Sequence, residues 1–190
     1  MKVLLKDYQK QTIMTKKKQY KQPVKQLSPN EYIKTKARSL PIYKCYINSY
    51  WIELALTTIF VTRQHTNGNF TIGYYRIDTF KRGLFKSRAF FNRSKETLAE
   101  MLEVLVPKDS EYATVVEIDY ALAHNIIYGG NALTKTNGFK ADKDFEISKY
   151  ILEENDDKIE YIEINFGKNE LREQERKENN GIDNYEEYLT

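Results

Sequence analysis

Cysteine is almost absent from this chain of 190 residues, which holds Cys45 alone. A single thiol cannot close a disulfide within the chain, so the fold does not depend on an oxidising compartment. No apolar run approaches the roughly 18 residues that a membrane-spanning helix requires. The apolar run of residues 3–5 is too short for the core of a signal peptide. The sequence therefore predicts a cytoplasmic location and no membrane segment.

Motifs of established chemistry are also missing. There is no Gly-x-Ser-x-Gly nucleophile elbow, and the two histidines, His65 and His124, lack the close spacing of a zinc site. Cys45 shows no sign of a partner histidine, so we interpret it as a small buried hydrophobic residue. Gly129-Gly130 lacks the lysine and hydroxyl residue of a phosphate-binding P-loop, and close packing of another element is expected there. We therefore predict no cofactor and no metal.

Basic and acidic residues concentrate at opposite ends of the chain. Residues 1–50 hold 12 Lys and Arg against 2 acidic residues, whereas residues 151–190 hold 5 against 13. This asymmetry favours a basic surface for a polyanion and an acidic tail that competes for it; an ordinary solvated surface with a charged tail is the alternative. We divide the chain into a basic N-terminal arm over residues 1–27, a single α+β domain over 28–167 and an acidic, flexible tail over 168–190.

Turn signals and alternation predict an α+β fold with an antiparallel β-meander of three or more strands and with helices packed on one face. Asn67-Gly68 favours a tight hairpin turn, because these residue types supply the positive φ angles that such turns need. The strands expected around this turn and after it cover residues 56–64, 70–80 and 84–91. The alternation over residues 162–166 predicts a last, half-buried strand.

Helices are expected where apolar residues recur every three or four positions. Ser28 and Glu31 form a capping box that opens a first helix, and this helix ends before Pro41. A second capping box is expected at Thr114, with Glu117 three residues later. The further helices expected from these signals cover residues 94–106, 114–136 and 142–154.

The predicted hairpin combines cations with aromatic rings, which is the composition of a nucleic-acid-binding surface. Lys and Arg neutralise phosphates, and an exposed ring stacks on an unpaired base for about 1–3 kcal/mol. Strand alternation places Tyr74 and Arg76 on one face and Tyr75 on the other. The alternative is that the rings belong to the core and the charges are solvated. The predicted nucleic-acid-binding residues are Arg63, Tyr74, Tyr75, Arg76, Lys81, Arg82, Lys86 and Arg88.

A second group of residues points to metal-dependent chemistry. Two or three carboxylates at a sheet edge can hold Mg²⁺ for phosphodiester cleavage, and the catalytic candidates are Asp78, Glu117, Asp119 and His124. On an ideal helix, however, Glu117 and Asp119 point to opposite sides, about 200° apart. A single histidine on an apolar helix is more simply interpreted as a hydrogen-bonded core residue, and we interpret His124 in this way.

Part of the chain resembles a group of uncharacterised bacterial domains. The shared features lie at residues 121–129, with the pattern His-Asn-x-x-Tyr-Gly, at Gly138-Phe139, at Lys143-Asp144-Phe145, at Trp51, from Arg63 to Asp78, near Gly83 and Lys86, and at Phe166-Gly167. The resemblance covers residues 41–167. Here Leu84-Phe85 separates the glycine from the lysine, and Lys168-Asn169-Glu170 stands where Gly-Lys-Pro is typical. The group has no established activity, so the resemblance implies domain limits and no mechanism.

From these observations we expect a non-catalytic nucleic-acid-binding or accessory protein that uses its basic-aromatic hairpin. A metal-dependent phosphodiesterase or nuclease that uses Asp78 with Asp119 or Glu117 is one alternative. A protein-interaction subunit of a larger assembly is the other, because charged arms such as residues 1–27 are often ordered only on a partner. The expected partners are accordingly DNA or RNA, or a protein bound through residues 1–27.

Overall fold

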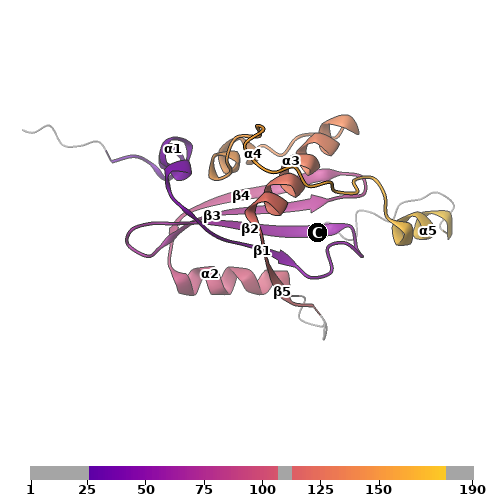
Figure 1. The fold of residues 1–190 in the computed structure, drawn as a ribbon, viewed down its shortest axis with the longest axis horizontal. Coiled ribbons are helices and arrows are strands. Elements are labelled where there is room, and N and C mark those ends of the chain that lie inside the picture. The colour runs from indigo at the N-terminus through magenta and orange to yellow at the C-terminus, as the bar shows by residue number, and fades with distance from the viewer. Residues whose placement is uncertain (1–25, 107–112, 179–190) are drawn as a thin grey trace, which may run out of the picture.

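The computed structural model describes residues 26–106 and 113–178. Its centre is a five-stranded antiparallel sheet with the strand order β4-β3-β2-β1-β5 (Figure 1). The strands are β1 (Ile42–Asn48), β2 (Leu56–Gln64), β3 (Phe70–Asp78), β4 (Gly83–Arg93) and β5 (Val115–Ile118). The first four strands follow one another as a meander, and β5 returns to pair with the open edge of β1.

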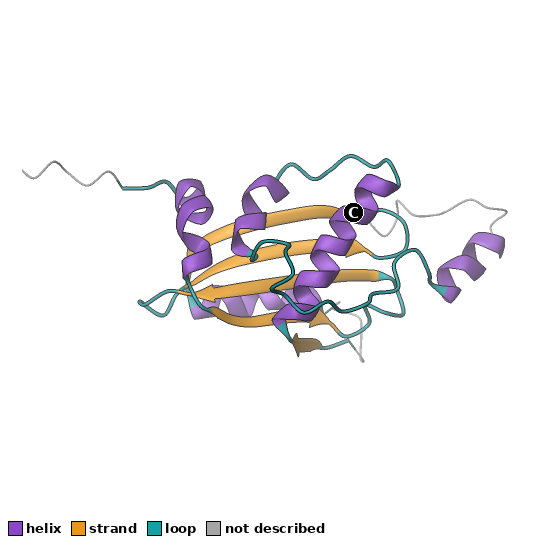
Figure 2. Cartoon of the chain, turned by 45° about the horizontal axis from the view of Figure 1, so that its top comes forward, coloured by secondary structure: helices purple, strands orange, loops and turns teal. Residues whose placement is uncertain are grey.

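Helices cover both faces of the sheet, as Figures 1 and 2 show. One face carries α1 (Pro29–Lys36), α3 (Tyr120–Thr136) and α4 (Phe145–Ser148). The opposite face carries α2 (Lys95–Leu102). Short 3₁₀ turns extend three of these helices, namely η1 (Ala37–Ser39), η2 (Glu103–Leu105) and η3 (Lys149–Ile151), and a last helix, α5, covers Glu170–Glu178.

Two hydrophobic cores follow from the alternation of side chains along the strands. The larger core lies between the sheet and the helices α1, α3 and α4, and it takes Ile59 and Val61 from β2. The smaller core lies under α2, where Phe60 and Ile72 of the strands meet Leu98 of the helix. Both faces of the central strands are therefore buried over part of their length.

The predicted α+β class and antiparallel meander are confirmed. The helices differ from the expectation in that α2 packs on the second face, because the large apolar side chains of Phe60 and Ile72 need cover there. No helix within the described ranges is long and apolar enough to cross a membrane. Of the predicted arm and tail, residues 1–25 and 179–190 lie outside the described residues.

Three predicted elements were wrong in part. Residues 114–119 do not start a helix: Val115–Ile118 form β5, and α3 begins at Tyr120 with Asp119 as its N-cap residue. The helix expected over residues 142–154 is reduced to α4 and η3. Residues 162–166 form no strand, because no neighbouring strand pairs with them, and their apolar side chains Ile164 and Phe166 pack against the larger core instead.

Candidate nucleic-acid interface

A carboxylate closes the hairpin between β3 and β4. Asp78 is 1% exposed and accepts hydrogen bonds from the backbone N–H groups of Phe80 (2.9 Å), Lys81 (3.2 Å) and Arg82 (2.5 Å). Aspartate is favoured in turns because its side chain can satisfy such backbone donors. Lys81, a predicted nucleic-acid-binding residue, lies in this turn with its side chain half-buried. Asp78 is thus a structural residue of the hairpin.

Cross-strand register gathers cations on the face of the sheet that carries α2. Arg76 of β3 pairs with Lys86 of β4, and Tyr74 pairs with Arg88. Directly paired residues project from the same face of a sheet. Tyr74 packs in the smaller core beside α2, which fixes the face that these four residues share. The hairpin therefore presents three cations next to α2.

A bulge brings a further aromatic ring to this face. The register between β3 and β4 shifts after Arg76, which leaves Phe85 as an extra residue in β4. The guanidinium groups of Arg76 and Arg82 lie 5.2 and 5.4 Å from the centre of the Phe85 ring, within cation–π distance. We name this surface the basic face, and it consists of Tyr74, Arg76, Arg82, Phe85, Lys86 and Arg88.

A groove of about 280 Å³ runs along the basic face beside α2. The sheet contributes the rings of Phe60 and Tyr74, whose centroids lie 5.2 Å apart, and the ring of Phe90. Lys86 and Arg88 supply the cations. Helix α2 and the turn that follows it contribute Glu100, Met101 and Val104. The groove thus has an apolar floor with charged groups at its rim.

No carboxylate within residues 26–106 and 113–178 pairs with the cations of the basic face. None of its four cations forms an ion pair with another described residue, whereas Arg38 contacts Glu154 at 2.7 Å on the other side of the sheet. Burial raises the pKa of Tyr74, while the charges of Arg76 and Arg88 act in the opposite direction. The phenol therefore stays uncharged at neutral pH and adds no negative charge to the face.

Two of the predicted nucleic-acid-binding residues are buried, and the prediction was wrong for both. Arg63 is 1% exposed, and its guanidinium donates to the carbonyl oxygen of Ile151 and to the carboxylate of Glu153. Tyr75 is fully buried in the larger core, and its hydroxyl donates to the carbonyl oxygen of Ser148. Strand alternation turns both side chains toward the layer of α4 and η3, away from the basic face.

The predicted acidic group does not converge. Glu117 lies on β5 and contacts Lys44 at 2.6 Å, and Asp119 stands at the N-cap position of α3 without a side-chain capping hydrogen bond. Asp78 ends β3, which is three strands from β5, a separation of roughly 14 Å between strand axes alone. Carboxylates that share a divalent ion contact it within about 2.0–2.6 Å. The phosphodiesterase alternative therefore has no site in these residues, and no group of three or more His, Cys, Asp and Glu among the described residues could hold a metal ion.

His124, the remaining catalytic candidate, is a core residue of α3. It is 2% exposed, and its ring centroid lies 5.7 Å from that of Tyr120 and 4.6 Å from that of Tyr128. Its Nε2 atom has no hydrogen-bond partner within the described part of the chain, so the expected hydrogen bond is absent at this atom. Burial lowers the pKa of His124, and this effect outweighs the nearby carbonyl and carboxylate groups.

Replacement of His124 by phenylalanine is expected to make stability less sensitive to acid. Because the folded-state pKa of His124 lies below the ordinary value of 6.5, the unfolded chain takes up this proton first as pH falls, and the free energy of unfolding of the wild type decreases below that pH. Phenylalanine cannot be protonated, so the free energy of unfolding of the variant decreases less as the pH falls. Urea denaturation at a series of pH values measures the difference; equal losses in the two proteins would contradict the assignment. His65, whose pKa is also lowered by burial, is unchanged in both.

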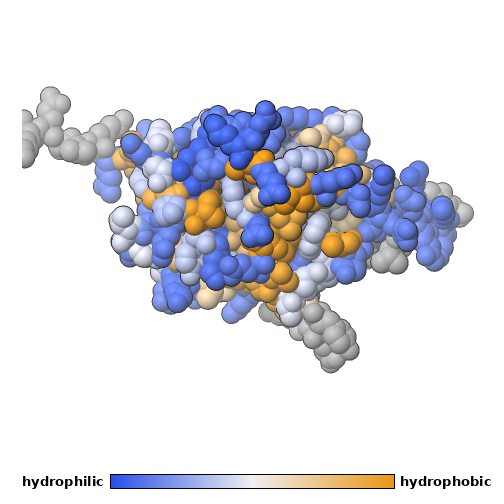
Figure 3. Space-filling view, viewed as in Figure 1, coloured by the Kyte–Doolittle hydropathy of each residue, from blue (hydrophilic) through white to orange (hydrophobic). Residues whose placement is uncertain are grey.

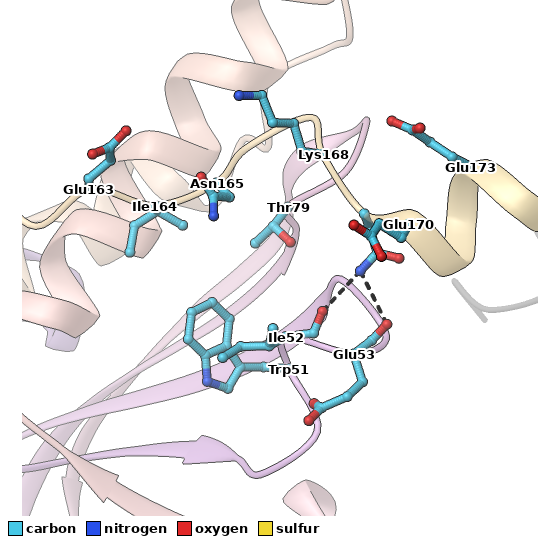
Figure 4. A pocket seen from close by; sticks show the side chains of 11 residues that line it. Trp51, Ile52, Glu53, Thr79, Glu163, Ile164, Asn165, Lys168, Glu170 and Glu173 are labelled. Atoms are coloured by element: carbon cyan, nitrogen blue, oxygen red, sulfur yellow. Dashed lines mark hydrogen bonds between the residues drawn. The ribbon is translucent and has the colours of Figure 1, made fainter.

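A second hollow, of about 920 Å³, lies between the loop after β1 and the segment that leads to α5 (Figure 4). The Nδ2 atom of Asn169 donates to the carbonyl oxygens of Ile52 (3.0 Å) and Glu53 (3.2 Å) and ties the two segments together. Trp51 lies on one wall. The charged lining residues are Glu53, Glu163, Glu170, Glu173 and Lys168. With four carboxylates against one ammonium group, this hollow has the wrong charge for a polyanion.

A hydrophobic band crosses the side of the molecule shown in Figure 3, over the start of α3 and the β1–β5 edge of the sheet, and hydrophilic residues surround it. The exposed apolar residues of the described chain include Val115 and Val116 of β5. An edge strand of only four residues offers little length for pairing with another chain. This apolar band offers no charge pattern from which a binding partner could be inferred.

Comparison with known proteins identifies no relative. No family model, no curated protein and no solved structure matches the chain. The resemblance of residues 41–167 to uncharacterised bacterial domains therefore stays a prediction, and the function has to be inferred from the site.

Proposed function

We propose that the protein binds nucleic acid through the basic face without catalysing a reaction. The observation that carries this proposal is the group of four cations without carboxylate partners among the described residues, arranged around two aromatic rings on one face of a sheet. Phosphate groups supply the missing negative charge, and this attraction is independent of sequence. The strand register holds the backbone positions of Arg76, Lys86 and Arg88 at fixed spacings.

The double substitution Lys86→Glu and Arg88→Glu is expected to weaken binding of a labelled oligonucleotide by at least about tenfold at low salt. It is also expected to lower the slope of log Kd against log salt by about two, because each lost phosphate contact releases one counterion fewer. Fluorescence anisotropy over a salt series measures both quantities. Parallel samples that contain Mg²⁺ are expected to retain an intact oligonucleotide, because the proposed function includes no cleavage.

The matched control is Lys34→Glu with Lys36→Glu, which changes two exposed lysines of α1 on the opposite face. Each substitution replaces one positive by one negative charge, so both double variants change the net charge from +3 to −1. Equal losses of affinity in the two variants would show that only net charge matters and would reject the basic face. Absence of any binding by the wild type would leave the protein-interaction subunit as the better hypothesis.

A further inference from the structure

The groove on the basic face has room for one flat ring. Its volume of about 280 Å³ lies just under the roughly 300–1,000 Å³ of pockets that hold drug-sized ligands. Tyr74, Phe90 and Met101 are only half-buried and leave accessible apolar surface along the groove, whereas Phe60 is 1% exposed and closes it from below. Aromatic surfaces of this kind stack on nucleobases, since every base has a π-face.

A base reaches this floor only when it is unpaired. In a duplex the bases are paired and stacked inside the helix, and withdrawal of one of them has to overcome both interactions. The backbone of a single strand, in contrast, can follow the rim of the groove. Lys86 and Arg88 are two residues apart on one face of β4, about 6.8 Å along the strand, and Arg76 and Arg82 continue the positive charge toward the hairpin turn.

Glu100 gives the groove a chemical preference. It lines the groove from α2, whereas Lys86 and Arg88 line it from the sheet, and no hydrogen bond or ion pair joins the Glu100 carboxylate to another described residue. An ionised carboxylate only accepts hydrogen bonds. It therefore repels a phosphate group that enters the groove, but it accepts a hydrogen bond from an exocyclic amino group such as that of cytosine. Thymine presents a carbonyl oxygen at the same position, which Glu100 repels.

We propose that the ligand is a single-stranded nucleic acid and that one of its bases, carrying an exocyclic amino group, enters the groove between β4 and α2 with this amino group directed to Glu100. The inference rests on the proposed function, because the phosphates of the same strand are held by the basic face. Tyr74 and Phe90 contact the base, Lys86 and Arg88 contact the adjoining phosphates, and Glu100 determines which base is preferred.

The experiment compares labelled oligodeoxycytidine with oligodeoxythymidine of equal length, about 12 nucleotides, within the site size of single-strand-binding folds. Both are pyrimidine strands, and they differ in the group that faces Glu100. The wild type is expected to bind the cytidine strand at least about tenfold more tightly, the effect of one hydrogen bond to a charged group. Glu100→Gln is expected to bring the two affinities close together, because a glutamine amide both donates and accepts.

The matched control is Glu103→Gln, an exposed glutamate of η2 that does not line the groove and gives the same change in charge. It is expected to leave the cytidine preference unchanged. Equal affinity of the wild type for the two strands, an equal shift of preference in both variants, or equally tight binding of a duplex would overturn the base site while the proposed function stands. Failure of every oligonucleotide to bind, or equally tight binding of polyglutamate, would overturn both.

Discussion

Replacement of Arg63 by methionine is expected to lower the free energy of unfolding by about 3–5 kcal/mol, because three backbone carbonyl oxygens lose their donor at about 1–3 kcal/mol each. Arg63 is the largest fully buried side chain of the described residues. Methionine replaces the aliphatic part of the Arg63 side chain by a similar unbranched apolar chain and removes all of the guanidinium donors. Urea denaturation measures the loss, which is a large part of the roughly 5–15 kcal/mol by which a typical domain is stable.

The size of this effect follows from the acceptors that Arg63 serves. Its Nε donates to the carbonyl oxygen of Ile151 at 2.5 Å, and one terminal nitrogen donates to the carbonyl oxygen of Leu40 at 2.6 Å and to that of Arg38 at 3.2 Å. These backbone groups belong to η1 and the residue that follows it, and to the end of η3. A buried carbonyl that loses its donor keeps the full penalty of its desolvation. Arg63 thus fastens two chain segments to β2.

The control for this prediction is Glu153→Ala, which removes the ionic partner and leaves the guanidinium with its carbonyl acceptors. The Glu153 side chain is 41% exposed although the Arg63 side chain is 1% exposed, so water screens the pair and the loss is expected to be about 1 kcal/mol. A loss in Glu153→Ala as large as that in Arg63→Met would assign the stabilisation to the ion pair instead. The folded fraction of Arg63→Met is expected to bind oligonucleotide as the wild type does, since Arg63 is remote from the basic face.

The elements that were predicted correctly are those fixed by neighbouring residues. The capping box of Ser28 and Glu31 is present, with bonds of 2.8 and 3.3 Å, and α1 begins at Pro29 as expected. The hairpin at Asn67-Gly68 joins β2 to β3, with Gly68 at a φ of +85°. In these places the local signal and the tertiary fold agree, so a sequence pattern is sufficient.

The wrong predictions arise where a segment distant in the sequence determines the secondary structure. Thr114 and Glu117 have the spacing of a capping box, but the open edge of β1 pairs with Val115–Ile118, and the carbonyl oxygen of Thr114 accepts a hydrogen bond from Ser49. The β-branched Val115 and Val116 suit a strand, and their pairing with β1 outweighs the local helix signal. A partner 65 residues away along the chain is invisible to a local pattern.

The residues of the candidate interface were likewise predicted only in part. Alternation along β3 separated Tyr74 from Tyr75, but only the packing of α2 and α4 shows which of the two faces is filled by the larger core. Arg63 was grouped with the cations of the hairpin because it is close to them in sequence. Glu100 was missed altogether, because no local signal indicates that its turn of α2 lies beside Arg88.

Replacement of Gly83 by alanine is expected to destabilise the protein by about 2–5 kcal/mol, the sum of left-handed strain and overpacking. Gly83 has a φ of +76°, and a Cβ atom there would overlap the carbonyl oxygen of Gly130 and the Oγ1 atom of Thr134 and would lie 2.5 Å from the backbone nitrogen of Thr134. The hairpin and α3 meet at this point, and Thr134 donates to the carbonyl oxygen of Arg82 at 3.0 Å. The neighbours are mainly backbone, so they cannot move aside.

Gly130 contributes to the same close approach from the side of α3. A Cβ atom there would lie 2.5 Å from Cγ2 of Ile77, which confirms that close packing explains a glycine inside this helix. Its intrinsic cost to the helix is about 1 kcal/mol relative to alanine. The hairpin that carries the basic face is therefore positioned by contact between two glycine-bearing segments, and a larger residue at either of them displaces α3 from β3 and β4.

Gly138→Ala separates the two causes of the Gly83 effect. Gly138 has a φ of +73°, nearly that of Gly83, but a Cβ atom at Gly138 would meet nothing within 4 Å. The same strain of about 1–2 kcal/mol is expected there, without the overlap. Both substitutions also restrict the unfolded chain by similar amounts, so the difference between their free energies of unfolding isolates the packing of α3 against the hairpin. Equal losses in the two variants would mean that strain alone matters and that α3 does not position the basic face through Gly83.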